Sequence, residues 1–157
     1  METKFLLSNK FKPVGWLLFI GSALVWAYSV LFYPADTVQL RTKVFVIYGN
    51  DAFGKGGSES KYFSFLETDI FPTMIALLFI LGGLLLAFSK EKTEDEFIAK
   101  LRLQSFQWAF LCNYVVLFLL FFFMYGFEFL FVLQYYMFVM LILFICRFHY
   151  LLYKNKN

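Results

Sequence analysis

Five polar side chains lie at or near the two ends of an apolar stretch and are the candidates for chemistry in this sequence. They are Lys100, Arg102, Gln107, Arg147 and His149. If the stretch folds back on itself at residues 126–128, equal counting along two antiparallel helices sets Gln107 level with Arg147. Guanidinium and ammonium groups together bind anions, so one predicted chemistry is binding of a lipid headgroup or of an acidic segment of a partner protein.

A structural role is the alternative for the same residues, and it is the interpretation we favour. Arg147 and His149 would complement the carbonyl end of a helix. Long basic side chains also extend from apolar surface towards water without forming a binding site.

Enzymatic chemistry finds little support among the residue types. His149 is the sole histidine, which excludes bis-His haem ligation and argues against a His-rich metal site. The sequence holds no HExxH motif, no phosphate-binding glycine loop and no CxxC motif. A Ser/His/Asp arrangement would place Ser105 beside His149, but no acid is positioned behind them. We therefore expect a non-enzymatic protein without a metal or another cofactor.

The elements that must position these side chains are long apolar segments. The chain has 157 residues, 61% of them hydrophobic, and a mean hydropathy of +0.69, which is too apolar for a soluble domain to bury. About 20 apolar residues cross a bilayer as a helix. The expected spans are about 14–33, 70–89, 103–125 and 129–150. The predicted fold class is an all-α membrane protein, a single domain over residues 1–157 with four transmembrane helices.

The third span is expected to continue a charged helix start over residues 93–104 without a break. Thr93 and Glu96 have the spacing of a capping box, in which each side chain satisfies a free backbone N–H. On a helical wheel Arg102 shares one face with Ala109 and Asn113. The basic residue is therefore placed where the helix passes from the membrane surface into apolar surroundings.

A small β-hairpin is predicted in the loop of residues 35–69. Residues 42–48 and 61–68 are rich in β-branched and aromatic side chains, and the segment between them holds four glycines. The first strand is apolar on both faces, so we expect one face to lie on the bilayer surface or on the helix ends. A ligand-binding cap is the functional alternative. Asp69 is the expected N-cap of the second span.

Small residues four apart predict where helices approach closely. Two pairs have this spacing: Ala23 with Ala27, and Gly83 with Ala87. We expect these two faces to pack together. Few small residues occur between 103 and 146, so we expect the third and fourth spans to pack less closely or to face more lipid. A tight turn at residues 125–128 makes those spans antiparallel, and this register keeps Cys112 and Cys146 apart as two free, buried thiols.

Basic residues predict the orientation. Ten of the fourteen Lys and Arg residues lie in three segments, 1–13, 90–102 and 147–157, whereas the 35–69 loop holds four. The excess of basic residues marks the cytoplasmic side, so both termini are expected there and the hairpin outside. A cleaved signal peptide is the competing interpretation of the first span, but residues 27–29 form a poor cleavage site. The basic residues form no dense run, so no nucleic-acid partner is expected.

One string carries a family resemblance. The segment FSKEKTEDEFIAKLRLQSFQWA, followed by CNY and later by RFHYLLYK, resembles a family of small, uncharacterised four-helix inner-membrane proteins of Bacteroidota-type bacteria. The resemblance covers residues 10–154 and is most specific over residues 89–114. It implies a multi-pass protein of the bacterial inner membrane, and it assigns no catalytic residue.

These observations predict a regulatory or accessory membrane component that binds a protein partner or a lipid. The alternative is a small channel or transporter subunit that gains a pathway only as a homo-oligomer.

Overall fold

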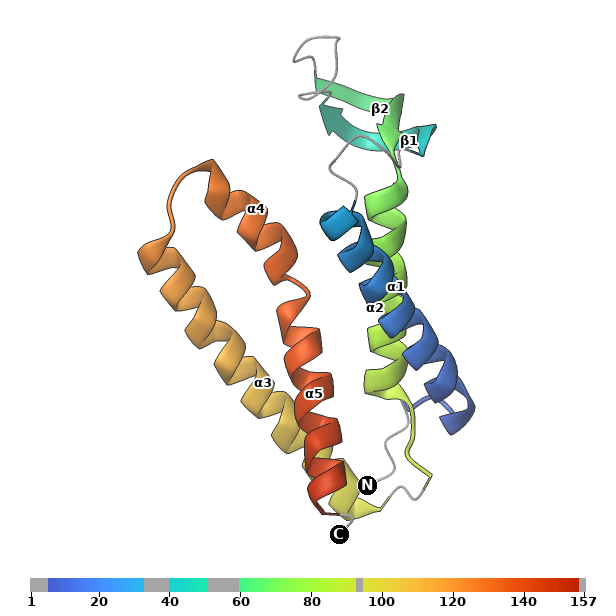
Figure 1. Ribbon diagram of the computed structural model, residues 1–157, viewed down its shortest axis with the longest axis vertical. Helices are drawn as coiled ribbons and strands as arrows, with labels where there is room; N and C mark the ends of the chain where they lie inside the picture. The colour runs from blue at the N-terminus through green and yellow to red at the C-terminus, as the bar shows by residue number, and fades with distance from the viewer. Residues whose placement is uncertain (1–5, 33–39, 51–59, 93–94, 156–157) are drawn as a thin grey trace. The chain divides into compact units, whose positions relative to one another are not determined.

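The computed structural model describes residues 6–32, 40–50, 60–92 and 95–155. The chain forms two compact units, one of Met1–Ile20 with Phe79–Asn157 and the other of Gly21–Leu78. Along the chain the elements are η1 (Asn9–Phe11), α1 (Lys12–Phe32), β1 (Arg41–Asn50), β2 (Ser60–Asp69), α2 (Phe71–Phe88), α3 (Glu96–Phe123), α4 (Phe127–Tyr136) and α5 (Val139–Lys154) (Figure 1).

Four segments of the described chain are long and apolar enough to cross a membrane. They are Asn9–Ser29, Phe71–Phe88, Glu96–Phe123 and Phe129–Lys154. The four-helix part of the predicted fold class is therefore confirmed, with boundaries that differ by a few residues from those expected.

The predicted hairpin is confirmed in the second unit. Strands β1 and β2 pair antiparallel, from Arg41 opposite Asp69 to Asn50 opposite Ser60. The Asp69 carboxylate accepts hydrogen bonds from the backbone N–H of Phe71 (3.1 Å) and of Leu40 (2.9 Å). The expected N-cap of α2 thus also fastens the start of β1 to that helix.

Both faces of the hairpin carry exposed aromatic side chains. The Phe45 and Phe65 rings lie 5.6 Å apart on one face, where 53% and 70% of each residue is exposed. Tyr48 and Tyr62 pair on the other face, with ring centroids 5.1 Å apart. The expected cover of one face by the bilayer or by helix ends stays a prediction. Part of the glycine-rich tip, residues 51–59, lies outside the described residues.

Glycines hold α1 and α2 close together within the first unit. A Cβ atom on Gly82 would lie 2.6 Å from the backbone nitrogen of Phe19, and one on Gly15 would lie 3.2 Å from the Gly82 carbonyl oxygen. Position 82 therefore needs glycine for this approach, whereas a Cβ at position 15 requires its neighbours to shift by a few tenths of an ångström. Gly83 instead faces the side chain of Leu141 in α5, so its predicted pairing with α1 is wrong. The spacing of small residues shows that a close approach is possible, not which helix makes it.

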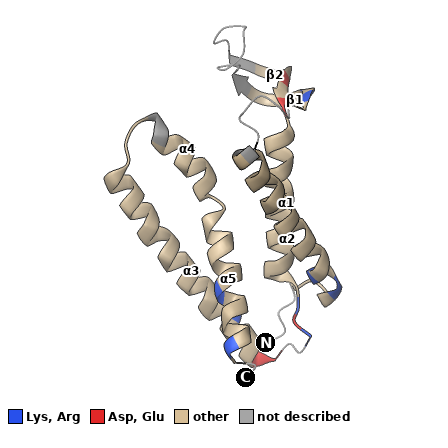
Figure 2. Ribbon diagram, in the orientation of Figure 1, with Lys and Arg blue, Asp and Glu red and all other residues tan. Residues whose placement is uncertain are grey.

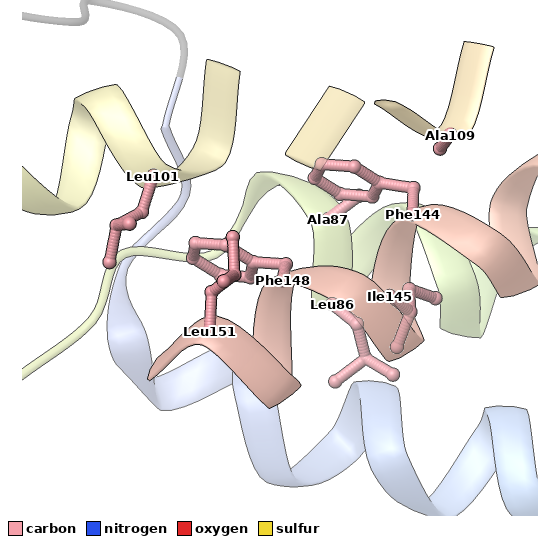
Figure 3. Packing of buried hydrophobic residues seen from close by; sticks show 8 residues of the cluster. All are labelled: Leu86, Ala87, Leu101, Ala109, Phe144, Ile145, Phe148 and Leu151. Atoms are coloured by element: carbon pink, nitrogen blue, oxygen red, sulfur yellow. The ribbon is translucent and has the colours of Figure 1, made fainter. Parts of the chain in front are cut away.

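The core of the first unit lies where α2, α3 and α5 meet (Figure 3). Its buried hydrophobic residues are Leu86, Ala87, Leu101, Ala109, Phe144, Ile145, Phe148 and Leu151. Along α3 the buried residues recur at every fourth position, at Leu101, Ser105, Ala109 and Asn113, which places them on one face of the helix. Small side chains at 105 and 109 let α5 approach α3, so of the two expected outcomes, looser packing is not found in this half.

The fourth predicted span, 129–150, is not one regular helix. α4 ends at Tyr136 and α5 begins at Val139. Between them the Phe138 N–H donates to the Tyr135 carbonyl (3.2 Å), three residues back rather than four. The Tyr136 hydroxyl donates to the backbone carbonyl of Asn113 and so joins the end of α4 to α3. Neither proline nor glycine marks this irregularity in the sequence.

The two ends of α3 agree with prediction to different degrees. Gly126 adopts φ = +83° directly before α4, a conformation that favours glycine, and the predicted turn between antiparallel helices is confirmed. At the other end α3 begins at Glu96, and the N-cap residue Asp95 makes no side-chain capping bond. Thr93, the predicted cap, lies outside the described residues. The helix then continues unbroken to Phe123, as expected.

Residues before α1 are bound to the end of α2, which the sequence did not reveal. The Leu7 N–H donates to the Phe88 carbonyl (2.8 Å), and the Lys90 N–H donates to the Leu7 carbonyl (2.9 Å). The Lys12 ammonium lies 2.5 Å from a carboxylate oxygen of Glu91. These contacts close the end of the first unit that carries the candidate site.

Candidate functional site

Arg102 projects from α3 at the edge of the core. One guanidinium N–H donates to the Ser89 carbonyl (3.2 Å), and the guanidinium carbon lies 5.2 Å from the centre of the Phe148 ring. A cation over an aromatic face is attracted by the negative face of the ring. The carbonyl and the ring together fix the direction of the Arg102 side chain.

Arg147 of α5 has different partners. Its guanidinium carbon lies 4.9 Å from the Trp108 ring centre and 5.8 Å from that of Tyr150. Trp108 follows Gln107 directly, so the Arg147 side chain reaches α3 one residue from the level expected from counting. Sequence analysis missed Trp108, although an aromatic beside a predicted basic partner is a usable signal.

His149 points to a third neighbour, α1. Its ring packs edge-on against Trp16 with centroids 5.1 Å apart. Its Nδ1 lies 2.9 Å from the Ile145 carbonyl oxygen, four residues earlier in the same helix. Ser105, the suggested nucleophile, is fully buried and its hydroxyl donates to the Leu101 carbonyl (2.7 Å). The contacts of the Ser105 hydroxyl and the His149 ring are therefore those of packing and helix geometry.

The remaining two predicted residues, Lys100 and Gln107, are exposed on α3. The structure thus places Arg102 against Phe148, Arg147 against Trp108 and Tyr150, and His149 against Trp16 and, at 5.7 Å, Phe148. It leaves the other two on the surface. The five residues share one end of the unit without sharing one set of partners. Figure 2 shows basic residues at the ends of α1, α3 and α5 in this unit.

A groove beside Arg102 is the feature that sequence analysis missed. It has a volume of about 630 Å³, within the usual range for ligand pockets. The lining residues come from α2, α3, α5 and the turn before α5: Leu84, Ala87, Phe88, Ala99, Arg102, Leu103, Phe106, Met137, Met140, Leu141 and Phe144. Arg102 is the one polar side chain among these described residues. No local sequence pattern predicts the groove, because it forms where three segments that are distant in the sequence pack incompletely.

Other site chemistries have little to build on in the described part of the chain. Among those residues no group of three His, Cys, Asp or Glu side chains is placed to hold a metal ion. Cys112 and Cys146 are both free, the first partly exposed and the second exposed. The expectation that both thiols are buried is therefore wrong, because they lie on outward helix faces.

Comparisons with protein-family models, with curated proteins and with solved structures found no match to this chain. The resemblance to a bacterial inner-membrane family accordingly stays a prediction.

Proposed function

We propose that this chain is a non-enzymatic, multi-pass membrane protein that binds an anionic group at Arg102 and acts as a regulatory or accessory component. The observation that carries the proposal is that Arg102 is the one polar side chain among the described residues that line an apolar groove. A guanidinium forms strong, charge-assisted hydrogen bonds with phosphate and carboxylate groups, so an anionic ligand suits this position. The anion belongs to a lipid headgroup or to an acidic segment of a partner protein.

The proposed membrane is the bacterial inner membrane, with both termini in the cytoplasm and the hairpin outside. The four apolar segments support the spanning arrangement, and the distribution of basic residues supports its direction.

Cysteine labelling tests the orientation. In a variant with Cys112→Ser and Cys146→Ser, single cysteines are introduced at positions 8, 58 and 155 in place of Ser8, Ser58 and Asn155. An impermeant maleimide added to intact spheroplasts should label position 58 alone, and all three positions after lysis. Labelling of either terminal position before lysis would reverse the proposed orientation.

Purification in mild detergent tests the function. An anionic lipid or an acidic protein should copurify with the unmodified chain and be depleted from the Arg102→Gln variant. Lys100→Gln is the matched control, since it removes one positive charge from an exposed position on the same helix. A homo-oligomer that mediates ion or solute flux in liposomes would favour the channel or transporter alternative and contradict the proposal.

A further inference from the structure

We infer that the groove between α2, α3 and α5 holds one acyl chain of an anionic phospholipid, whose headgroup binds the Arg102 guanidinium. This inference rests on the proposed function, since it identifies the anion at the same residue. It adds the chemical class of the ligand and the place of its apolar part.

The composition of the groove matches an amphiphile rather than a free anion. Of the eleven described residues that line it, ten are apolar and the eleventh is Arg102. A peptide segment would place backbone N–H and carbonyl groups against those apolar walls, where each lost hydrogen bond costs free energy. A hydrocarbon chain carries no such groups, and it gains dispersion contacts on the walls instead.

The groove is long enough to hold most of the part of an acyl chain that lies in one leaflet. Its lining runs from Ala99 to Phe106 on α3, and from Met137 to Phe144 on the facing segment. Seven residues at a rise of about 1.5 Å per residue give a length of roughly 10 Å. Half of a hydrocarbon core of about 30 Å is about 15 Å, so an acyl chain that starts at Arg102 lies in the groove over about two thirds of its leaflet.

The Arg102 guanidinium is held in place by its neighbours, whereas part of the groove wall can adapt its shape, and both properties suit a lipid site. Phe148 and the Ser89 carbonyl hold Arg102 before any ligand arrives, so little side-chain entropy is lost when its planar guanidinium meets a phosphate. Met137 and Met140 line the far part of the groove. Methionine side chains adapt their shape, so this part accommodates chains of different length and unsaturation.

Native mass spectrometry of the full chain in detergent tests the inference. Dipalmitoyl phosphatidylglycerol is compared with dipalmitoyl phosphatidylethanolamine, which has the same chains and no net charge. The anionic lipid should bind about tenfold more tightly, and Arg102→Gln should remove that preference while Lys100→Gln keeps it. Dihexanoyl phosphatidylglycerol, with the same headgroup and short chains, should bind the unmodified protein at least about tenfold more weakly than the dipalmitoyl lipid.

Two variants that fill the groove test the position of the chain. Ala99→Phe and Met140→Trp each add bulk to a lining position and should lower binding of dipalmitoyl phosphatidylglycerol several-fold. The chain-length comparison uses unmodified protein, so it decides the matter even if both variants unfold.

The outcomes separate this inference from the proposed function. Equal binding of short-chain and long-chain phosphatidylglycerol, with loss of both in Arg102→Gln, would overturn the acyl-chain site and leave the anion site standing. The same holds if inorganic phosphate displaces the long-chain lipid completely, or if an acidic peptide binds and the lipid does not. If Arg102→Gln weakens the binding of no anion, both the acyl-chain site and the proposed function are overturned.

Discussion

The two halves of the long antiparallel pair formed by α3 with α4 and α5 pack in opposite ways. From Leu101 to Asn113, α3 buries every fourth residue against the core. Beyond Asn113 its phenylalanines are largely exposed, and Phe118, at 69%, is an example. Residues 101–113 include charged and amide side chains, whereas residues 114–123 have none. The closely packed half is the less hydrophobic one, so hydrophobicity does not explain its packing.

Side-chain size explains it. Ser105 and Ala109 are small and fully buried, and they allow a large ring of α5, Phe148, to fill the space beside α3. After Asn113 the small residues of α3 end, and at this point the Tyr136 hydroxyl donates to the Asn113 carbonyl. Where lipid is as apolar as the side chains, close packing decides which helices stay together.

Removal of the buried ring should have the largest effect. Phe148→Ala leaves a cavity at a residue only 1% exposed and removes the ring under Arg102. We expect a loss of about 3 kcal/mol in the free energy of unfolding, measured by SDS titration in mixed micelles. Phe118→Ala is the control from the exposed half and should change this free energy by less than about 0.5 kcal/mol. Equal losses at the two positions would remove the basis of the comparison.

Overfilling the packed half should be the next largest effect. Ala109→Phe inserts a ring where the exposed fraction is 0%, and we expect a loss of about 2 kcal/mol. Val115→Phe, at a position 52% exposed in the other half, should be close to neutral. The same SDS titration measures both variants. A tolerated ring at position 109 would show that α5 does not approach α3 there.

The turn that closes the loosely packed half should be less sensitive. Gly126 has φ = +83° and open space where a Cβ would lie, so Gly126→Ala is penalised by backbone conformation alone. We expect a loss of about 1 kcal/mol in the free energy of unfolding. Gly21→Ala, in helix α1 and also with open space, should be neutral or slightly stabilising. A neutral Gly126→Ala variant would mean that the turn adopts another conformation.

We expect the two thiols to stay free and to form no disulfide with each other. Arg147 lies over Trp108 and the helices are antiparallel, so Cys146 is level with residues near 109, about three residues from Cys112. At about 1.5 Å per residue this offset is roughly 4–5 Å along the helices, to which the distance of about 8–10 Å between the axes is added. Alkylation in denaturant without reductant should give two adducts by intact mass. A species without adducts and two protons lighter would refute the register of the packed half.

Features encoded by a few neighbouring residues could be predicted from the sequence. The length of each apolar segment, the Asp69 cap, the Gly126 turn and the paired strands depend on local chemistry. The helical wheel placed Ala109 and Asn113 on one face of α3, and both are buried in the structure, although the wheel predicted neither their burial nor the helix that packs against them.

Features that depend on contacts with distant parts of the chain could not be predicted from the sequence. Gly83 has the same local signal whether it faces α1 or α5. The break after Tyr136 follows from a tertiary contact with α3 and has no proline or glycine to mark it. Arg102, Arg147 and His149 were expected to converge, but helix rotation turns adjacent positions of α5 to different neighbours. The groove required the relative placement of three helices.

The contact between Lys12 and Glu91 bears on the order in which parts of the chain reach their final contacts during synthesis. The two residues are 79 positions apart in the chain. At a synthesis rate of about 5–20 residues per second, Glu91 is synthesised roughly 4–16 s after Lys12. The start of the first helix is therefore completed by residues that follow the second, and the earliest part of the polypeptide is among the last to reach its final contacts.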